Sequence, residues 1–89
     1  DYLLQLDGRI LPIELKAGAA GAMKSLHQFM FDKNLDFAVR CDANPPSVQD
    51  LAVKTTQGDP VRYRLLNVPL HLLWNLPALV PAALAGREA

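Results

Sequence analysis

The stretch that decides the fold, residues 2–16, reads YLLQLDGRILPIELK. Two runs rich in Leu and Ile, residues 2–6 and 10–16, flank the dipeptide Asp7-Gly8. Asp-Gly between apolar runs is a strong local signal for a two-residue turn, because both turn positions need a positive φ. The sequence therefore predicts an antiparallel β-hairpin at the start of the chain.

The turn also predicts the register of this hairpin. With a two-residue loop, Leu6 faces Arg9, and the other facing pairs follow by counting outward along both strands. Asp1 then lies opposite Glu14, at a non-hydrogen-bonded position where Cα atoms are ~4.5 Å apart. Lys16, two residues beyond Glu14, points to the same side of the sheet. We therefore expect two carboxylates and one ammonium to converge.

This predicted trio suggests a chemistry. Two adjacent carboxylates repel each other unless a proton or a cation lies between them, and oxygen ligands at this spacing suit Mg²⁺ or Mn²⁺. A lysine beside the metal could orient or deprotonate an attacking water and offset the charge of a phosphorane. The pattern therefore indicates metal-dependent phosphodiester hydrolysis by Asp1, Glu14 and Lys16. The alternative is an ordinary solvated strand face with a cross-strand ion pair.

The rest of the chain alternates between helical and extended patterns. The sequence predicts a helix at 22–33, a short buried strand at 37–41, a loop at 43–50, a second hairpin from strands at 51–57 and 61–67, and two short helices, one from Pro69 to about Trp74 and one beginning near Asn75 and Pro77. The order β-β-α-β-β-β-α-α predicts an α+β or α/β domain with a mixed β-sheet flanked by helices.

The composition excludes several classes of protein. Among 89 residues, nine Lys and Arg balance nine Asp and Glu. This balance excludes a polybasic chain held on nucleic acid by charge alone, and an acidic disordered tail. A single cysteine, Cys41, excludes an intrachain disulfide framework and favours the cytoplasm. The chain starts at Asp1 inside a strand-like run and has no signal sequence, so we expect a fragment of a longer protein.

The C-terminal part of the chain is strongly apolar. Residues 65–85 contain no Asp, Glu, Lys or Arg, a length that could span a bilayer, but three prolines interrupt the run. Because a proline inside a helix costs ~3 kcal/mol, we do not expect a membrane span. We divide the chain into a β-β-α-β-β-β core at 1–67 and a proline-interrupted helical tail at 68–89. The tail is expected to pack on the core or to form an interface, including a homo-oligomer through 65–85.

Five segments of the chain carry a family resemblance: Asp1-Tyr2-Leu3-Leu4, Leu11-Pro12-Ile13-Glu14-Leu15-Lys16-Ala17-Gly18, Lys24-Ser25-Leu26-His27-Gln28-Phe29, Ala38-Val39-Arg40 and Leu66-Asn67-Val68-Pro69-Leu70. Together they resemble the C-terminal domain of bacterial and archaeal AAA-type ATPases. In that family an uncharacterised domain follows the ATP-binding core and resembles restriction endonucleases of the PD-(D/E)xK superfamily. The resemblance thus implies a restriction-endonuclease-like core.

The resemblance implies roles for the predicted trio. Asp1 and Glu14 would be metal ligands for Mg²⁺ or Mn²⁺, and Lys16 would be the catalytic lysine. ATP would bind only to a separate domain of the same polypeptide, because no Walker motif occurs in this sequence. The expected function is a nuclease-like domain of an AAA-type ATPase that acts on nucleic acid. The alternative is a catalytically inactive interaction or oligomerisation module of the ATPase.

Six further residues are weaker candidates for contacts with a nucleic-acid backbone: Lys24, Ser25, Gln28, Arg40, Arg62 and Arg64. The first three lie near the start of the predicted first helix, where free backbone N–H groups could receive a phosphate. The three arginines lie on predicted strands and could contact phosphates. For each of the six, the alternative is an ordinary solvated surface or ion-pair role.

Overall fold

The predicted hairpin forms one edge of the sheet. The structure, a computed structural model, describes residues 2–6, 8–15 and 22–85, so Asp1 and Lys16 lie outside the described residues. β1 (Tyr2–Leu6) pairs antiparallel with β2 (Arg9–Leu15), from Leu6 opposite Arg9 to Tyr2 opposite Ile13. This confirms the predicted register for every described pair.

A helix connects β2 to the next strand. α1 (Ala22–Lys33) ends in a Schellman motif, in which the N–H of Leu35 donates to the carbonyl of Met30 and that of Asn34 to the carbonyl of Phe31. Asn34 takes the left-handed conformation this motif requires, with φ 53°. The chain then enters β3 (Phe37–Asp42), which runs parallel to β2.

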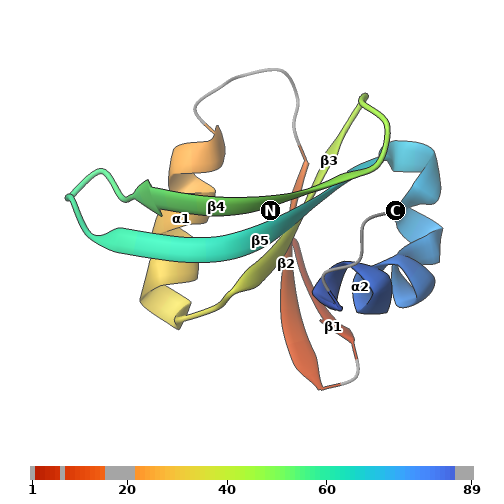
Figure 1. The fold of residues 1–89 in the computed structure, drawn as a ribbon, viewed down its shortest axis with the longest axis horizontal. Coiled ribbons are helices and arrows are strands. Elements are labelled where there is room, and N and C mark those ends of the chain that lie inside the picture. The colour runs from red at the N-terminus through yellow and green to blue at the C-terminus, as the bar shows by residue number, and fades with distance from the viewer. Residues whose placement is uncertain (1, 7, 16–21, 86–89) are drawn as a thin grey trace.

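The second hairpin completes the sheet on the other side. β4 (Ser47–Lys54) pairs antiparallel with β5 (Pro60–Pro69), and β5 also pairs in parallel with β3. The strand order is therefore β1-β2-β3-β5-β4 (Figure 1). The prediction of a loop at 43–50 is wrong for its last four residues, because Ser47 to Asp50 pair with β5 despite the two preceding prolines.

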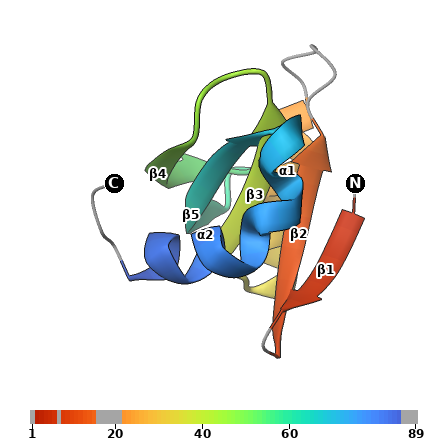
Figure 2. The same ribbon diagram turned by 90° about the vertical axis from the view of Figure 1, so that its right-hand side faces the viewer.

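Helices cover both faces of the central strands (Figure 2). On one face, Leu26 and Met30 of α1 contact a buried set from β3 and β5: Ala38, Val61, Tyr63 and Leu65. On the other face, α2 (Leu76–Leu84) packs with Leu76, Val80 and Ala83 against a second buried set: Leu11, Phe37, Val39, Leu66 and Val68. The protein is therefore an α+β domain with a mixed five-stranded sheet flanked by helices.

The C-terminal tail turns back onto the sheet in two short helices. The segment after β5 is a 3₁₀ helix, η1 (Leu70–Asn75), and α2 follows it directly, with a proline in its first turn and Pro81 inside it. A proline in the first turn is tolerated because its missing N–H would have no helical partner there. No helix in the described part of the chain is long and apolar enough to cross a membrane.

The register of the first hairpin depends on the turn at Gly8, whose φ is 78°. A left-handed conformation costs a β-branched residue about 1–2 kcal/mol, whereas Asn tolerates it. We therefore expect Gly8→Val to lower the free energy of unfolding in urea by about 1–2 kcal/mol, and Gly8→Asn to lower it less. Equal stability of the wild type and Gly8→Val would show that the turn does not need this conformation.

Candidate functional site

A row of polar side chains crosses the sheet at one level. Glu14 on β2 pairs with Arg40 on β3, Arg40 pairs with Asn67 on β5, and Asn67 pairs with Ser47 on β4. Facing residues on neighbouring strands share one side of a sheet. This side is the one covered by α1, because Ala38, two residues before Arg40, contacts that helix. We call Glu14, Arg40, Asn67 and Ser47 the polar row.

The polar row lies near the carboxyl ends of three parallel strands. Glu14 is one residue from the end of β2, and Arg40 and Asn67 are each two residues from the ends of β3 and β5. In open sheets of this kind, ligands bind outside the carboxyl ends of the parallel strands. The position of the row is therefore one where a ligand is expected.

Asn67 is the central member of the row and is only 2% exposed. Its side-chain oxygen accepts a hydrogen bond from Arg40 Nε at 2.7 Å. Its side-chain nitrogen donates to Ser47 Oγ at 3.2 Å and to Gln49 Oε1 at 3.3 Å. Burial of an amide is costly unless its donors and acceptors are paired, and these three bonds pair both ends. The amide orientation is therefore fixed.

Arg40 is fixed at one end of its guanidinium group. Nε donates to Asn67 and lies 3.5 Å from Asp42 Oδ2, and the side chain is 19% exposed. A guanidinium group has five N–H donors, four of them on Nη1 and Nη2. No described residue forms a hydrogen bond or ion pair with these terminal nitrogens. Within the described part of the chain, this end of Arg40 is therefore available to an anion.

Glu14 is a buried carboxylate, 7% exposed, next to Arg40 in the register. Among the described residues it takes part in no ion pair, since the ion pair of Arg40 goes to Asp42. Asp42 lies two residues beyond Arg40 on the same face, and its position is also held by a bond from the N–H of Asn44 at 3.0 Å. Glu14 is thus an acidic group at the site without a described cation bound to it.

A tyrosine and a histidine contact each other on the same face of the sheet as the polar row. The hydroxyl of Tyr63, on β5, is 2.7 Å from Nδ1 of His27, on α1. Burial raises the pKa of Tyr63 to about 12, the positive charge of Arg40 opposes this rise, and the negative charge of Glu14 adds to it. Burial also lowers the pKa of His27. Both shifts favour the uncharged forms of the two side chains at neutral pH.

The predicted metal site can be judged from Glu14 alone, because Asp1 and Lys16 are outside the described residues. Within residues 2–6, 8–15 and 22–85, no group of three or more His, Cys, Asp or Glu side chains could hold a metal ion. Asp42 is engaged by Arg40. The described residues therefore offer Glu14 as one carboxylate ligand, and the second predicted ligand, Asp1, lies outside them.

Among the described residues, no hydrogen bond or ion pair joins the three candidates on α1 to the polar row. Leu26 and Met30 face the sheet, whereas Lys24 and Ser25 are exposed. Gln28 donates to Asp32 Oδ1 on the same helix at 2.8 Å. The structure thus places these candidates at the helix surface, while His27 of the same helix contacts the sheet.

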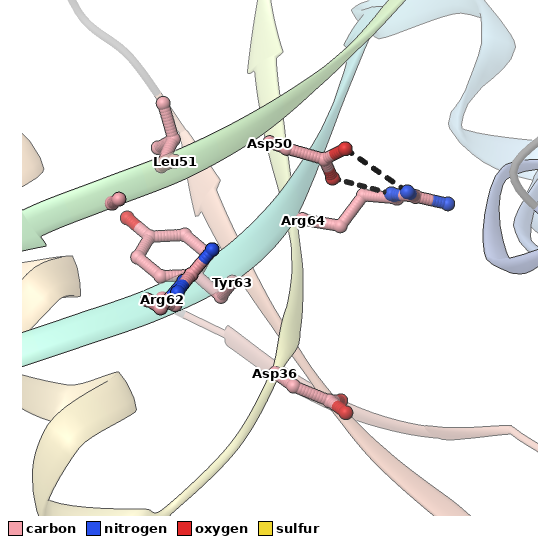
Figure 3. A pocket seen from close by; sticks show the side chains of 7 residues that line it. Asp36, Asp50, Leu51, Arg62, Tyr63 and Arg64 are labelled. Atoms are coloured by element: carbon pink, nitrogen blue, oxygen red, sulfur yellow. Dashed lines mark hydrogen bonds and ion pairs between the residues drawn. The ribbon is translucent and has the colours of Figure 1, made fainter.

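Arg62 and Arg64 share one face of β5, as predicted, but it is the face opposite the polar row. They line a hollow of about 350 Å³ together with Asp36, Asp50, Leu51, Ala52 and Tyr63 (Figure 3). Arg64 forms two bonds to Asp50, at 2.6 and 3.0 Å, and its hydrogen bond lowers the pKa of Asp50. Arg64 also donates to the carbonyl of Ala83 at 2.9 Å, which ties α2 to the sheet.

The sequence indicated Glu14 and Arg40 as separate candidates. It did not indicate the residues that surround them in the structure: Asp42, Ser47, Gln49, Tyr63 and Asn67. The pairing of β3 with β2 and β5 brings these residues together across the sheet. One signal was present in the sequence, since Asn67 interrupts an otherwise apolar run from Leu65 to Val68. A polar residue inside a buried strand is expected to have a specific partner.

The lowered pKa of His27 predicts a dependence of stability on pH. The unfolded chain, with an ordinary histidine pKa of ~6.5, takes up this proton more readily than the folded chain. The stability that neutral His27 contributes is therefore present above pH ~6.5 and is lost as pH falls through the lowered pKa of the folded state. Between pH 7.5 and 5.5, urea unfolding should show a larger loss for the wild type than for His27→Gln. Equal losses would contradict this assignment.

Comparisons of the chain with models of protein families, with curated proteins and with solved structures found no match in any of the three.

Proposed function

We propose that this chain is the nuclease-like domain of an AAA-type ATPase, which binds nucleic acid and hydrolyses its phosphodiester bonds with the help of a divalent cation. The observation that supports this best is the buried carboxylate of Glu14 beside Arg40, near the carboxyl ends of parallel strands. An acid that can bind a metal and a cation that can bind phosphate are the groups this reaction needs side by side.

Each residue of the proposed site would have a distinct task. Glu14 and Asp1 would hold Mg²⁺ or Mn²⁺, which supplies Lewis acidity and lowers the pKa of a bound water. Lys16 would orient the attacking water. Arg40 would bind a non-bridging phosphate oxygen through its terminal nitrogens and offset the negative charge that builds up during hydrolysis.

The proposal predicts that loss of the Glu14 carboxylate abolishes metal binding and cleavage. Glu14→Gln keeps the size of the side chain but is a much weaker ligand, so calorimetry should lose the heat of Mn²⁺ binding. Cleavage of a labelled oligonucleotide should fall by at least ~100-fold. Asp32→Asn is the matched control, because it removes one exposed carboxylate on α1, away from the sheet.

Two results would contradict the proposal. One is the absence of Mn²⁺ binding and of cleavage by the wild-type chain and by the full-length protein. The other is cleavage that Glu14→Gln and Asp32→Asn reduce to the same small extent, since a carboxylate remote from the sheet should not matter.

The second candidate function is a non-catalytic module that joins ATPase subunits or contacts the ATPase domain. The observation in its favour is the exposed apolar surface of η1, where Leu70 is 68% exposed and Trp74 is 75% exposed. Isolated exposed apolar residues are common, but a large aromatic and a leucine on one short helix are typical of contact surfaces.

This second function predicts self-association through η1. In sedimentation velocity at micromolar concentration the chain should form a dimer or larger species, and Leu70→Ser with Trp74→Ser should return it to a monomer. The double substitution should leave thermal unfolding of the monomer nearly unchanged, because both side chains are exposed. A wild-type chain that is a monomer at all concentrations would contradict a homo-oligomer.

A further inference from the structure

Asn67 occupies a position that an apolar residue would fill at lower cost. Its neighbours along β5, Leu66 and Val68, are buried on the opposite face, and Leu65 on its own face is fully buried. Asn67 is as inaccessible as they are. A buried amide gives up its bonds to water and regains them only from three side chains. Such a fully paired polar network rigidifies the groups it contains.

The hydrogen bond to Asn67 restricts the orientation of Arg40. Asn67 Oδ1 binds Nε, the inner nitrogen of the guanidinium group, and not the terminal nitrogens. Because the group is planar, fixing Nε restricts the plane and the direction of the remaining donors. Two parallel N–H groups of arginine match two oxygens of a phosphate, which makes a bidentate pair. An arginine held in this way needs less reorganisation when it binds such an anion.

The charges around Arg40 allow an anion to bind. Asp42 lies 3.5 Å from Nε, so this ion pair is made on the same inner side as the bond to Asn67. The terminal nitrogens have no described partner, and the side chain is 19% exposed. Glu14, the neighbour on the other side, weakens anion binding when no cation or proton neutralises it, so we expect binding in EDTA to be weaker than binding with Mg²⁺ or Mn²⁺.

We infer that Asn67 is a positioning residue that fixes Arg40 as the receptor for one phosphodiester group of a nucleic-acid backbone, beside Glu14. The identity of the ligand rests on the proposed function. The binding step itself needs no metal ion, which allows the two to be tested separately.

The test is the salt dependence of oligonucleotide binding in EDTA. Fluorescence anisotropy of a labelled single-stranded oligonucleotide gives the slope of log K against log salt, which changes by about 0.7 for each phosphate contact on a single strand. Arg40→Gln should reduce the magnitude of the slope by about 0.7. Asn67→Leu should reduce it by a similar amount, and the double variant should lose no more than Arg40→Gln alone.

Arg9→Gln is the matched control, because this exposed arginine is the first residue of β2 and lies at the opposite end of that strand from Glu14. It should leave the slope unchanged. If Asn67→Leu fails to fold, the wild-type chain still provides a test by NMR: the oligonucleotide should shift the Nε–H resonance of Arg40 and leave that of Arg9 in place.

Three results would overturn the inference: no binding in EDTA, a folded Asn67→Leu variant with the wild-type slope, or equal effects of Arg40→Gln and Arg9→Gln. Failure of the proposed hydrolysis would look different, because cleavage with Mn²⁺ would be absent while the slopes still depended on Arg40 and Asn67. The converse result is also distinguishable. If Glu14→Gln abolishes cleavage and Arg40→Gln leaves it unchanged, the proposed hydrolysis stands and the proposed role of Arg40 is wrong.

Discussion

The structure depends on one constraint: the two central strands are covered by helices on both faces, so a polar side chain buried on them must find its partners in the sheet or in the covering helices. β3 and β5 contribute most of the buried residues. Arg40 and Asn67 meet the constraint by binding each other, with Ser47 and Gln49 completing the network. A buried amide left unpaired would cost about 1–3 kcal/mol, so the network is required for stability as well as for the orientation of Arg40.

The two faces of the sheet hold different groups together. The face under α1 carries the polar row, near the carboxyl ends of the parallel strands, and Tyr63, which bonds His27 of α1. The opposite face carries Arg64, whose bonds to Asp50 and to a carbonyl of α2 hold the tail in place. The arginines of the described residues therefore do not form one basic surface. This division agrees with the balance of nine basic and nine acidic residues in the sequence.

The sequence predicts the local features of this fold well. Asp7-Gly8 predicts the first hairpin and its register, because a two-residue turn leaves no freedom in the pairing of the adjacent strands. The parallel pairs of β3 with β2 and β5 join residues far apart in the chain, and no short pattern encodes them. Local signals also failed at Ser47, where the preceding prolines suggested a loop but pairing with Asn67 extends the strand. Glu14 lies in the locally predicted hairpin and could be found as a candidate, whereas the partners of Asn67 lie on other strands that only tertiary pairing brings beside it.

The central claim is that Asn67 holds the guanidinium group of Arg40, and exchange of the Arg40 Nε–H with solvent tests it most directly. NMR of the wild-type chain should show this proton exchanging much more slowly than that of the exposed Arg62, with the protection lost in Asn67→Leu. The hydrogen bond at 2.7 Å and the low exposure of Arg40 both predict this protection. An Arg40 Nε–H that exchanges as fast as that of Arg62 would contradict the account.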